Sequence, residues 1–309
     1  MKYRELPFLD GTEERHAWEV FPPNDELGTI NRIGPGQLLA AARLVQAGKA
    51  ISLNLPLHLP GPIADGRDSY THHVEVGRTG RDDKLDNFFL QGSTQWDGLR
   101  HIRFRQYGYY GGRQESDLET TDVLGIDRLA ERGVFGRGVL LDVAGYQKNS
   151  GTPWPVWERT EITTDMLDAV AEAEGVRLQE GDVVLVRSGW LGWYLSLPPE
   201  ERDRVPSAQT MACAGLEPRP AMAEWLWDNG VAAIACDNPA LEALPVQKEF
   251  GFLHHRLLPL LGYLIGELMN LDPLAADCRA DNRYEGLFVS GPLHLRNGVG
   301  SPANAYMLK

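Results

Sequence analysis

The segment Asp182-Val-Val-Leu-Val-Arg187 decides the fold class of this 309-residue chain. Its short apolar run, rich in β-branched residues, is typical of a strand that is covered on both faces. Gly138–Val143 and Val231–Cys236 have the same character. Helical patterns lie between these runs: Thr164–Glu174 opens at a Thr or Asp cap, and Pro220–Asn229 ends before a glycine. This alternation of strands and helices predicts an α/β domain.

Outside these runs the sequence predicts further elements. Residues 37–48 place Leu38, Ala41, Ala42 and Val45 on one face of a helix that a glycine closes. Residues 50–57 alternate as a strand does, and residues 286–296 have the pattern of a strand, a turn and another strand. The polar, turn-rich segments 61–86 and 145–160 are expected to be long excursions within the domain.

Composition excludes several classes of function. The net charge of −13 is spread along the sequence, which argues against a nucleic-acid partner. Cys213, Cys236 and Cys278 are odd in number and lack CxxC spacing, so we expect buried free thiols. There is no signal-peptide pattern and no apolar stretch long enough for a membrane helix, which predicts a cytoplasmic protein without a membrane partner. We expect one domain over residues 1–309, with residues 1–30 as an N-terminal arm.

The densest group of polar residues is Gln91-Gly-Ser-Thr-Gln-Trp-Asp-Gly-Leu-Arg-His101. Burying such groups without partners would cost roughly 1 to 3 kcal/mol for each, which suggests a site. An extended chain would turn four of them to the same side: Gln91, Ser93, Gln95 and Asp97. A helix would instead join Gln91 to Gln95, and Asp97 to His101, at one-turn spacing. Either geometry brings the polar groups together.

Several chemistries are open to these residues. Asp97 can be a metal ligand, an orienting carboxylate or a helix cap. His101 can be a general acid or base, because imidazole titrates near pH 6.5, or a half-buried histidine satisfied by hydrogen bonds. Far along the chain, Glu267 lies in the apolar stretch Phe252–Leu271, where a charged carboxylate needs a partner unless it faces solvent from a helix. His254 is the candidate partner.

Two weaker candidates follow strands, where ligands approach open α/β sheets. They are Asp237–Pro245 and Arg187–Trp190, but a surface turn or a core aromatic residue is the better interpretation of either. The chain has no GxSxG, GxGxxG or P-loop motif, so neither a serine nucleophile elbow nor a nucleotide cofactor is expected.

These residues resemble the cyclase family of metal-dependent hydrolases, the group that contains bacterial kynurenine formamidase and isatin hydrolase. The resemblance runs from Leu27–Asn31 to Gly300–Pro302, nearly the whole chain. It implies an α/β fold of the swivelling β/β/α type in a single domain. It also implies a homodimer or higher homo-oligomer and a small-molecule substrate.

The family signature, H-x-G-T-H-x-D-x-P-x-H, falls on residues 91–101, with a later His and Glu completing a metal site. Its two ligand histidines fall on Gln91 and Gln95, and its proline falls on Leu99. The resemblance implies these metal ligands: Asp97, His254 (or His255) and Glu267, with Gln91 or Gln95 adding an oxygen. An amide oxygen suits harder cations than an imidazole does. One divalent ion is therefore expected, with Mn²⁺ or Mg²⁺ ahead of Zn²⁺.

Three functions remain open. The first is a metal-assisted hydrolase that opens a small cyclic amide, imide or lactone, or cleaves a formamide, with His101 as acid/base and Asp97 and Glu267 as further catalytic residues. The second is a metal-independent isomerase or cyclase that uses Gln91, Gln95, Asp97 and His101. The third is a non-catalytic binder of small molecules.

Aromatic residues near these segments favour an aromatic or otherwise cyclic substrate, although some of them will belong to the core. The predicted substrate-binding residues are Trp96, Phe104, Trp190 and His255.

Overall fold

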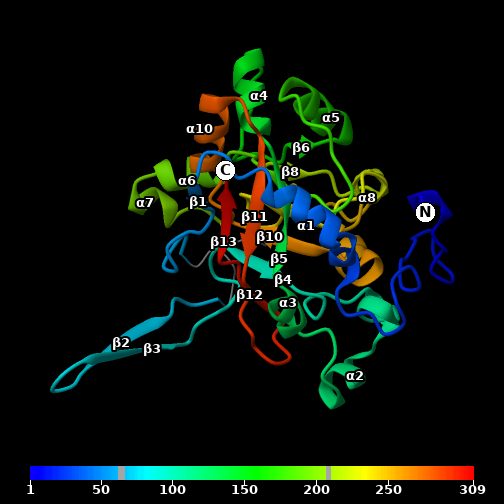
Figure 1. Cartoon of the computed structure of the whole chain (residues 1–309), viewed down its shortest axis with the longest axis horizontal. Coiled ribbons are helices and arrows are strands. Elements are labelled where there is room, and N and C mark those ends of the chain that lie inside the picture. Colours follow the sequence, from blue (N-terminus) through cyan, green and yellow to red (C-terminus); the bar gives the residue numbers. More distant parts are fainter. Residues whose placement is uncertain (62–66, 207–209) are drawn as a thin grey trace.

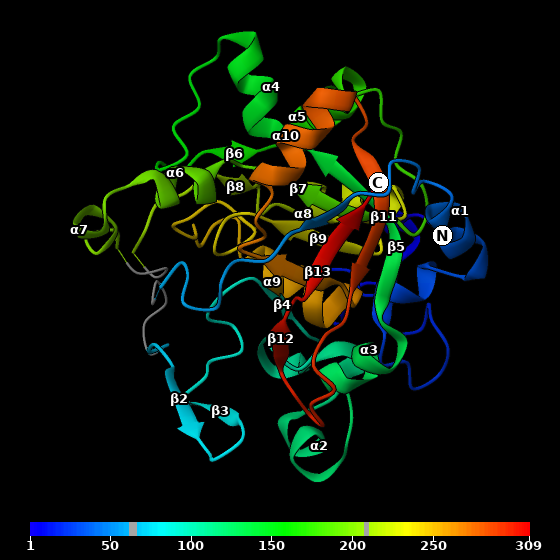
Figure 2. The same cartoon turned by 60° about the vertical axis from the view of Figure 1, so that its left-hand side comes forward.

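Nine strands form one curled, mixed sheet that runs through the centre of the molecule (Figures 1 and 2). The computed structural model describes residues 1–61, 67–206 and 210–309. The order of the strands in the sheet is β1-β13-β11-β5-β7-β9-β10-β4-β12. Their bounds are β1 Ala50–Ser52, β4 Gln95–Asp97, β5 Val134–Leu141, β7 Val183–Val186, β9 Ala233–Cys236, β10 Leu264–Glu267, β11 Glu285–Ser290, β12 Gly300–Pro302 and β13 Ala305–Leu308.

The three apolar runs of the sequence become neighbouring strands in the middle of this sheet. Strands β5, β7 and β9 run parallel to one another, and β10 extends the parallel set beyond β9. Every residue of β7 and β9 is buried, as expected of strands with both faces covered. The prediction of a mixed α/β fold is therefore confirmed.

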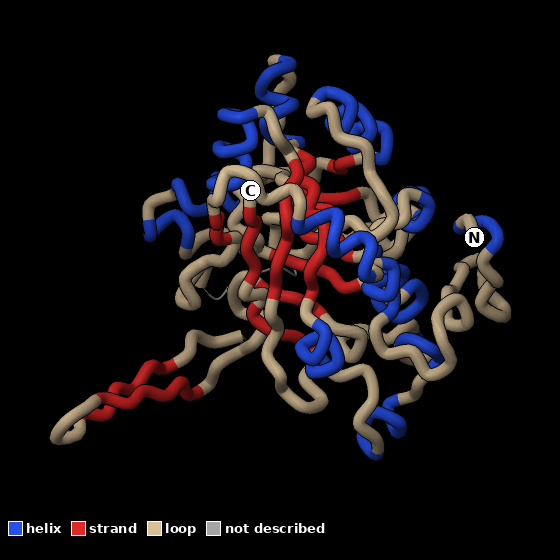
Figure 3. Tube along the Cα trace, in the orientation of Figure 1, coloured by secondary structure: helices blue, strands red, loops and turns tan. Residues whose placement is uncertain are grey.

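Helices cover both faces of the sheet (Figure 3). Helices α5 and α8 bury apolar residues against one face, and α3 and α10 bury theirs against the other. The helix bounds are α1 Pro35–Ala42, α2 Glu115–Thr120, α3 Ile126–Arg132, α4 Val143–Ser150, α5 Thr164–Ala173, α6 Trp190–Ser196, α7 Pro199–Arg202, α8 Pro220–Asp228, α9 Leu253–Arg256 and α10 Asp272–Asp281. A short π-helical turn, Leu257–Leu261, continues α9.

Two elements near the N-terminus are shorter than predicted. Helix α1 ends at Ala42 instead of reaching residue 48, because Leu44 and Val45 follow it in tight turns that bind back to the helix. Strand β1 ends at residue 52 instead of 57. The Asn54 side chain takes over the pairing with Ala305, donating to its carbonyl at 2.7 Å and accepting from its N–H at 2.8 Å.

The predicted excursions and the tail also differ in detail. Residues 62–66 of the 61–86 excursion lie outside the described part of the chain. The rest forms a separate two-stranded hairpin, β2 Thr71–Val76 with β3 Arg81–Asp86, which projects from the body (Figure 1). The 145–160 segment begins inside α4 and continues as a loop. In the tail, β11 is followed by a loop that contains Pro292, and the next strand is β12, beyond the predicted end at residue 296.

Two predictions from composition can be compared with the structure. Cys213, Cys236 and Cys278 are buried and free, as predicted. No helix within the described ranges is both long enough and apolar enough to cross a membrane.

Polar residues line the edge of the sheet where the four parallel strands end. Asp142 follows β5, Arg187 follows β7 and Asp237 follows β9, while Glu267 is the last residue of β10. This is the edge from which ligands approach open α/β sheets. The fold thus supplies charged groups at the place where a site is expected.

Candidate metal and catalytic site

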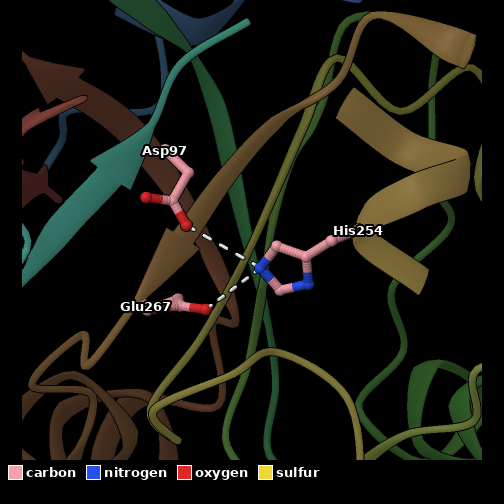
Figure 4. Close-up of side chains that lie close together, drawn as sticks. All are labelled: Asp97, His254 and Glu267. Carbon is pink, nitrogen blue, oxygen red and sulfur yellow. Dashed lines mark hydrogen bonds and ion pairs between the residues drawn. The ribbon is translucent and has the colours of Figure 1, made fainter. Parts of the chain in front are cut away.

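Three buried side chains converge beside the end of β10 (Figure 4). They are Asp97 from β4, His254 from α9 and Glu267 from β10, here called the site triad. The Nε2 atom of His254 lies 3.2 Å from Oε1 of Glu267 and 3.7 Å from Oδ2 of Asp97. None of the three residues is more than 5% exposed, so these ionisable groups face one another away from bulk water.

Strand pairing brings two members of the triad together. β4 runs antiparallel to β10, with Gln95 opposite Glu267 and Asp97 opposite Ile265. Because side chains alternate along a strand, Gln95 and Asp97 face the same side, toward Glu267. Trp96 between them faces the opposite side, where its Nε1 donates to Ser290 Oγ at 2.8 Å.

His254 is held by a carboxylate that the sequence analysis did not assign to the site. Glu242, fully buried, accepts from Nδ1 of His254 at 2.9 Å and from the backbone N–H of Leu253 at 2.9 Å. With a proton on Nδ1, the Nε2 lone pair of a neutral His254 points at the other two triad members. The signal in the sequence was the position of Glu242 shortly after β9, but no spacing rule connects it with His254.

Gln95 completes the floor of the site. Its Nε2 donates to Oε2 of Glu267 at 2.5 Å, while its Oε1 has no hydrogen-bond partner among the described residues. Oδ1 of Asp97 is also buried without a hydrogen-bond partner there. Leaving a buried acceptor unpaired costs roughly 1 to 3 kcal/mol. The two oxygens can therefore bind a hydrogen-bond donor or a cation that enters the site.

The site triad is electrostatically coupled. Burial opposes the charged form of His254, but Glu242, Asp97 and Glu267 outweigh burial and raise its pKa well above the usual value. Burial and the charge of Asp97 raise the pKa of Glu267 to about 7, against the opposing effect of His254. Without another cation, a protonated His254 is thus the positive charge that balances these carboxylates.

His101 lies at the edge of the triad. Its Nε2 is 3.7 Å from Oδ1 of Asp97, and its side chain is 21% exposed. Burial, together with the charges of His254 and Arg67, lowers the pKa of His101, although Asp97 opposes this. Burial also resists ionisation of Asp97, but His101 and His254 overcome it, and the pKa of Asp97 is lowered. An ionised carboxylate beside a neutral imidazole stabilises the charge that the imidazole acquires when it acts as a general base.

The residues present suit a divalent cation. Two ligand atoms at about 2.1 to 2.3 Å from one ion, at angles near 90 to 110°, are roughly 3.0 to 3.8 Å apart. The distances of 3.2 and 3.7 Å from His254 Nε2 to the oxygens of Glu267 and Asp97 lie in that range. The unpartnered oxygens of Asp97 and Gln95 could accept the same ion. One imidazole among several oxygens favours Mn²⁺, Mg²⁺ or Zn²⁺ over softer metals.

A cavity of about 220 Å³ reaches the triad at Glu267. Gln95 and Glu267 belong to its lining, and Gln91 lies on its wall. The remaining lining residues include three aromatic side chains, Tyr70, Phe88 and Phe89, and one arginine, Arg67. Arg67 and Tyr70 come from the 61–86 excursion, where sequence patterns gave no signal for a site, whereas Phe88 and Phe89 lie just before the polar segment 91–101 and their place beside it pointed to a site.

The predicted substrate-binding residues lie elsewhere. Trp96 packs edge-on against Phe288 in the core, and Trp190 is fully buried in α6. Phe104 and His255 contact each other edge-on, at 6.0 Å between ring centroids. None of the four predicted residues is part of the cavity lining in the described ranges. Of the two adjacent histidines, it is His254 that joins the triad.

The curled sheet and its buried Asp-His-Glu triad define an α/β protein of the cyclase fold with a candidate metal site. The chain belongs to the family described as "Putative cyclase", whose model matches residues 37–243. A crystal structure of a novel cyclase is 30% identical, covers 95% of this chain and 99% of its own, and superposes with a TM-score of 0.85. The family resemblance noted in the sequence is therefore confirmed.

More distant structures share the fold. An isatin hydrolase bound to the product analogue thioisatinate is 17% identical over 90% of this chain and 99% of its own, with a TM-score of 0.61. Isatin hydrolase A from Labrenzia aggregata, bound to benzyl benzoate, is 17% identical over 84% of this chain and 94% of its own, with a TM-score of 0.59. A predicted metal-dependent hydrolase from Bacillus stearothermophilus is 16% identical over 84% of this chain and 97% of its own, with a TM-score of 0.52. No curated protein matches the chain.

Proposed function

We propose that this protein is a hydrolase that opens a small cyclic amide, imide or lactone, or cleaves a formamide, at a C–N or C–O bond. The observation that carries the proposal is the buried triad beside His101 and a small cavity, with two acceptor oxygens, Asp97 Oδ1 and Gln95 Oε1, that have no hydrogen-bond partner among the described residues. The shared fold with two isatin hydrolases supports the same reaction class.

In this proposal Asp97, His254 and Glu267 hold one divalent ion, Mn²⁺, Mg²⁺ or Zn²⁺, and the amide oxygens of Gln95 and Gln91 are further candidate ligands. When bound, such an ion polarises a carbonyl group and makes water more acidic. Glu242 keeps the Nδ1 proton of His254 in place, so that Nε2 faces the ion.

The protein's own groups handle the protons. His101, neutral at pH 7, accepts a proton from the attacking water at Nε2 and returns it to the leaving nitrogen or oxygen. Asp97, whose Oδ1 lies 3.7 Å from this Nε2, stabilises the imidazolium that forms when His101 takes up the proton. Glu267 would serve in its ionised form, with Oε2 fixed by the hydrogen bond from Gln95 Nε2 and Oε1 facing His254.

Metal content and turnover test the proposal together. The purified protein should contain about one divalent ion per chain, and a chelator should abolish hydrolysis of substrates of this class until Mn²⁺ is restored. His101→Gln should lower kcat by about 100-fold or more while leaving metal content unchanged. His255→Gln, one residue from His254 but outside the triad, is the matched control. Activity that survives both the chelator and His101→Gln would overturn the mechanism.

A metal-independent isomerase or cyclase is the second candidate function. It is favoured by the hydrogen bond from Gln95 to Glu267, and by a protonated His254 that balances the carboxylates without an ion. Gln91 and Gln95 would then bind substrate while Asp97 and His101 transfer protons. Replacing both glutamines with His should abolish that activity, whereas a metal-dependent hydrolase should keep or gain metal affinity. A non-catalytic binder would show ligand binding without turnover in every variant.

The proposal extends to the assembly. We propose a single domain of the swivelling β/β/α type over residues 1–309, with residues 1–30 as an arm, acting as a homodimer or higher oligomer. The sheet takes its strands from residues 50 to 308, and Ala17 of the arm donates its N–H to the Leu260 carbonyl at 2.9 Å. Both observations support one folding unit.

A further inference from the structure

The cavity beside the triad has one aromatic wall and one guanidinium group. Tyr70 and Phe88 contact each other edge-to-face, at 5.9 Å between ring centroids, and Phe89 adds a third ring. The volume of about 220 Å³ is below the roughly 300 to 1,000 Å³ of sites for drug-sized ligands. A planar molecule with a single ring is therefore the shape that this cavity suits.

Arg67 is anchored at the wall of this cavity. Its Nη1 donates to the backbone carbonyl of Gln91 at 2.7 Å. Arg67 and Gln91 both line the cavity, so this hydrogen bond holds the guanidinium at the cavity wall. Its positive charge lowers the pKa of Asp97 and of Glu267, although it is not the largest influence on either group. Among the described residues no carboxylate forms an ion pair with Arg67, while its neighbour Asp68 also lines the cavity.

Gln95, at the floor of the cavity, offers a hydrogen-bond acceptor, whereas Arg67 offers donors. Gln95 is 1% exposed, and its Oε1 has no partner among the described residues. An amide oxygen only accepts hydrogen bonds, so it needs an N–H or O–H donor, which a ligand can supply when no ion uses this oxygen. The guanidinium only donates, and it binds carboxylates with two parallel hydrogen bonds.

We propose that Arg67 is the specificity-determining residue of this cavity and selects a single-ring aromatic anion, which carries a carboxylate toward Arg67 and a donor group toward Gln95. The inference rests on the proposed function only in placing the substrate in this cavity. Within the proposed function, it narrows the ligand from small cyclic compounds to a single-ring aromatic acid, which is either a formamide-bearing substrate or the ring-opened product of a fused cyclic amide, imide or lactone.

A pair of probes separates charge from shape. 4-Aminobenzoate and 4-aminobenzamide share the ring and the amino donor but differ in charge. Calorimetry on chelator-treated protein and on Mn²⁺-loaded protein should show wild type binding the carboxylate about 10- to 100-fold more tightly than the amide, because charge-assisted hydrogen bonds are stronger than neutral ones. Binding to chelator-treated protein distinguishes Arg67 from a metal ion as the group that takes the carboxylate.

Three variants assign the effect to Arg67. Arg67→Gln should lose at least tenfold in affinity for 4-aminobenzoate while changing the affinity for 4-aminobenzamide less than twofold, and Arg67→Lys should restore part of the loss. Arg78→Gln, at the exposed tip of the hairpin, is the control and should bind both probes as wild type does. Circular dichroism and Tm verify that each variant folds.

Four results would overturn the inference: equal affinity for the two probes, no binding of the carboxylate, binding that needs Mn²⁺ and ignores Arg67→Gln, or equal weakening of both probes by that substitution. None of these measurements depends on turnover. Failure to find hydrolysis would therefore leave this test intact, and failure here would leave the metal proposal standing.

Discussion

The site triad and a second ionic cluster lie along the same edge of the sheet but are built differently. The second cluster, here called the arginine cluster, consists of Asp142, Arg187, Asp272 and Arg279. Asp142 is 2% exposed and binds Nη1 of Arg187 at 2.7 Å and Nη1 of Arg279 at 2.6 Å, while Nε of Arg187 binds Asp272 at 2.6 Å. In the arginine cluster the oxygens of Asp142 are all engaged.

The triad has one titratable cation, His254, and in the described part of the chain Oδ1 of Asp97 and Oε1 of the adjacent Gln95 have no hydrogen-bond partner. Arginine keeps its charge at any physiological pH and satisfies carboxylates with a rigid fork of donors, whereas imidazole can give up its proton. The arginine cluster therefore keeps its carboxylates paired at any physiological pH. His254 of the triad can instead release its Nε2 proton and leave room for a metal ion, as a metal site requires.

The largest expected effect comes from the triad. Asp97→Asn removes a charged oxygen ligand, so affinity for Mn²⁺ should fall more than about 100-fold, beyond the 10- to 100-fold typical of outer-shell partners. The free energy of unfolding of the ion-free protein should change little or increase, because one under-paired buried charge is gone. Metal titration and urea unfolding measure the two effects. Unchanged metal affinity would show that Asp97 is not a ligand.

The reverse pattern is expected for the arginine cluster. Arg187→Met leaves Asp142 with one cation and should lower the free energy of unfolding by about 2 kcal/mol, less than for a fully buried pair because Asp272 and Arg279 are partly exposed. Metal affinity and turnover should stay within twofold of wild type. A loss of metal binding without a loss of stability would break the distinction between the two clusters.

A smaller effect is expected at the support of His254. Glu242→Gln can still accept a hydrogen bond from Nδ1 but loses its charge, so metal affinity should fall about tenfold. The change in kcat on the metal-saturated enzyme should be much smaller. Glu249→Gln, an exposed residue in the loop that precedes α9, is the matched control and should behave as wild type. An equal loss in both variants would contradict a positioning role for Glu242.

The smallest expected effect is a change in how the free energy of unfolding depends on pH, caused by Glu174 beside the arginine cluster. Glu174 accepts the Asp142 N–H at 3.0 Å, and burial raises its pKa from 4.5 to about 8. Between these values the unfolded chain has released this proton and the folded chain retains it, so stability falls as pH rises from about 4.5 to 8 and then levels off. Glu174→Gln should remove a fall on the order of 1 to 2 kcal/mol from the urea-unfolding profile, since Glu174 is only partly buried.

The sequence predicted the parts of this molecule that depend on local pattern. The apolar runs gave the central strands, and the residue spacing of 91–101 with the family resemblance pointed to Asp97, His101, His254 and Glu267. Trp96 shows where this prediction stops, because it was expected to bind substrate but lies in the core. Neighbouring residues in a strand point to opposite faces, and the pairing of β4 with β10 turns Trp96 away from the triad. The homodimer and the cytoplasmic location stay predictions.

The roles of Glu242 and Arg67 could not be predicted for a different reason, although Glu242 lies in the weak candidate segment Asp237–Pro245. Each acts through a contact that tertiary structure creates, from Glu242 to His254 and from Arg67 to the Gln91 carbonyl. Loops that surround a site have no periodicity from which such contacts can be read. Charged residues in loops are also common on protein surfaces, so their identity alone does not distinguish a site from a solvated turn.

The antiparallel pairing of β4 with β10 also bears on how the molecule assembles. Gln95 and Glu267, which meet across this pairing, are 172 residues apart in the chain. Contacts of such separation form only after a large loss of loop entropy, and they slow folding. His254 and Glu267 are only 13 residues apart, but Asp97 joins them through this pairing, so the complete triad forms once β4 has reached β10. In a refolding experiment, the time at which the protein binds the ion would therefore report when β4 pairs with β10.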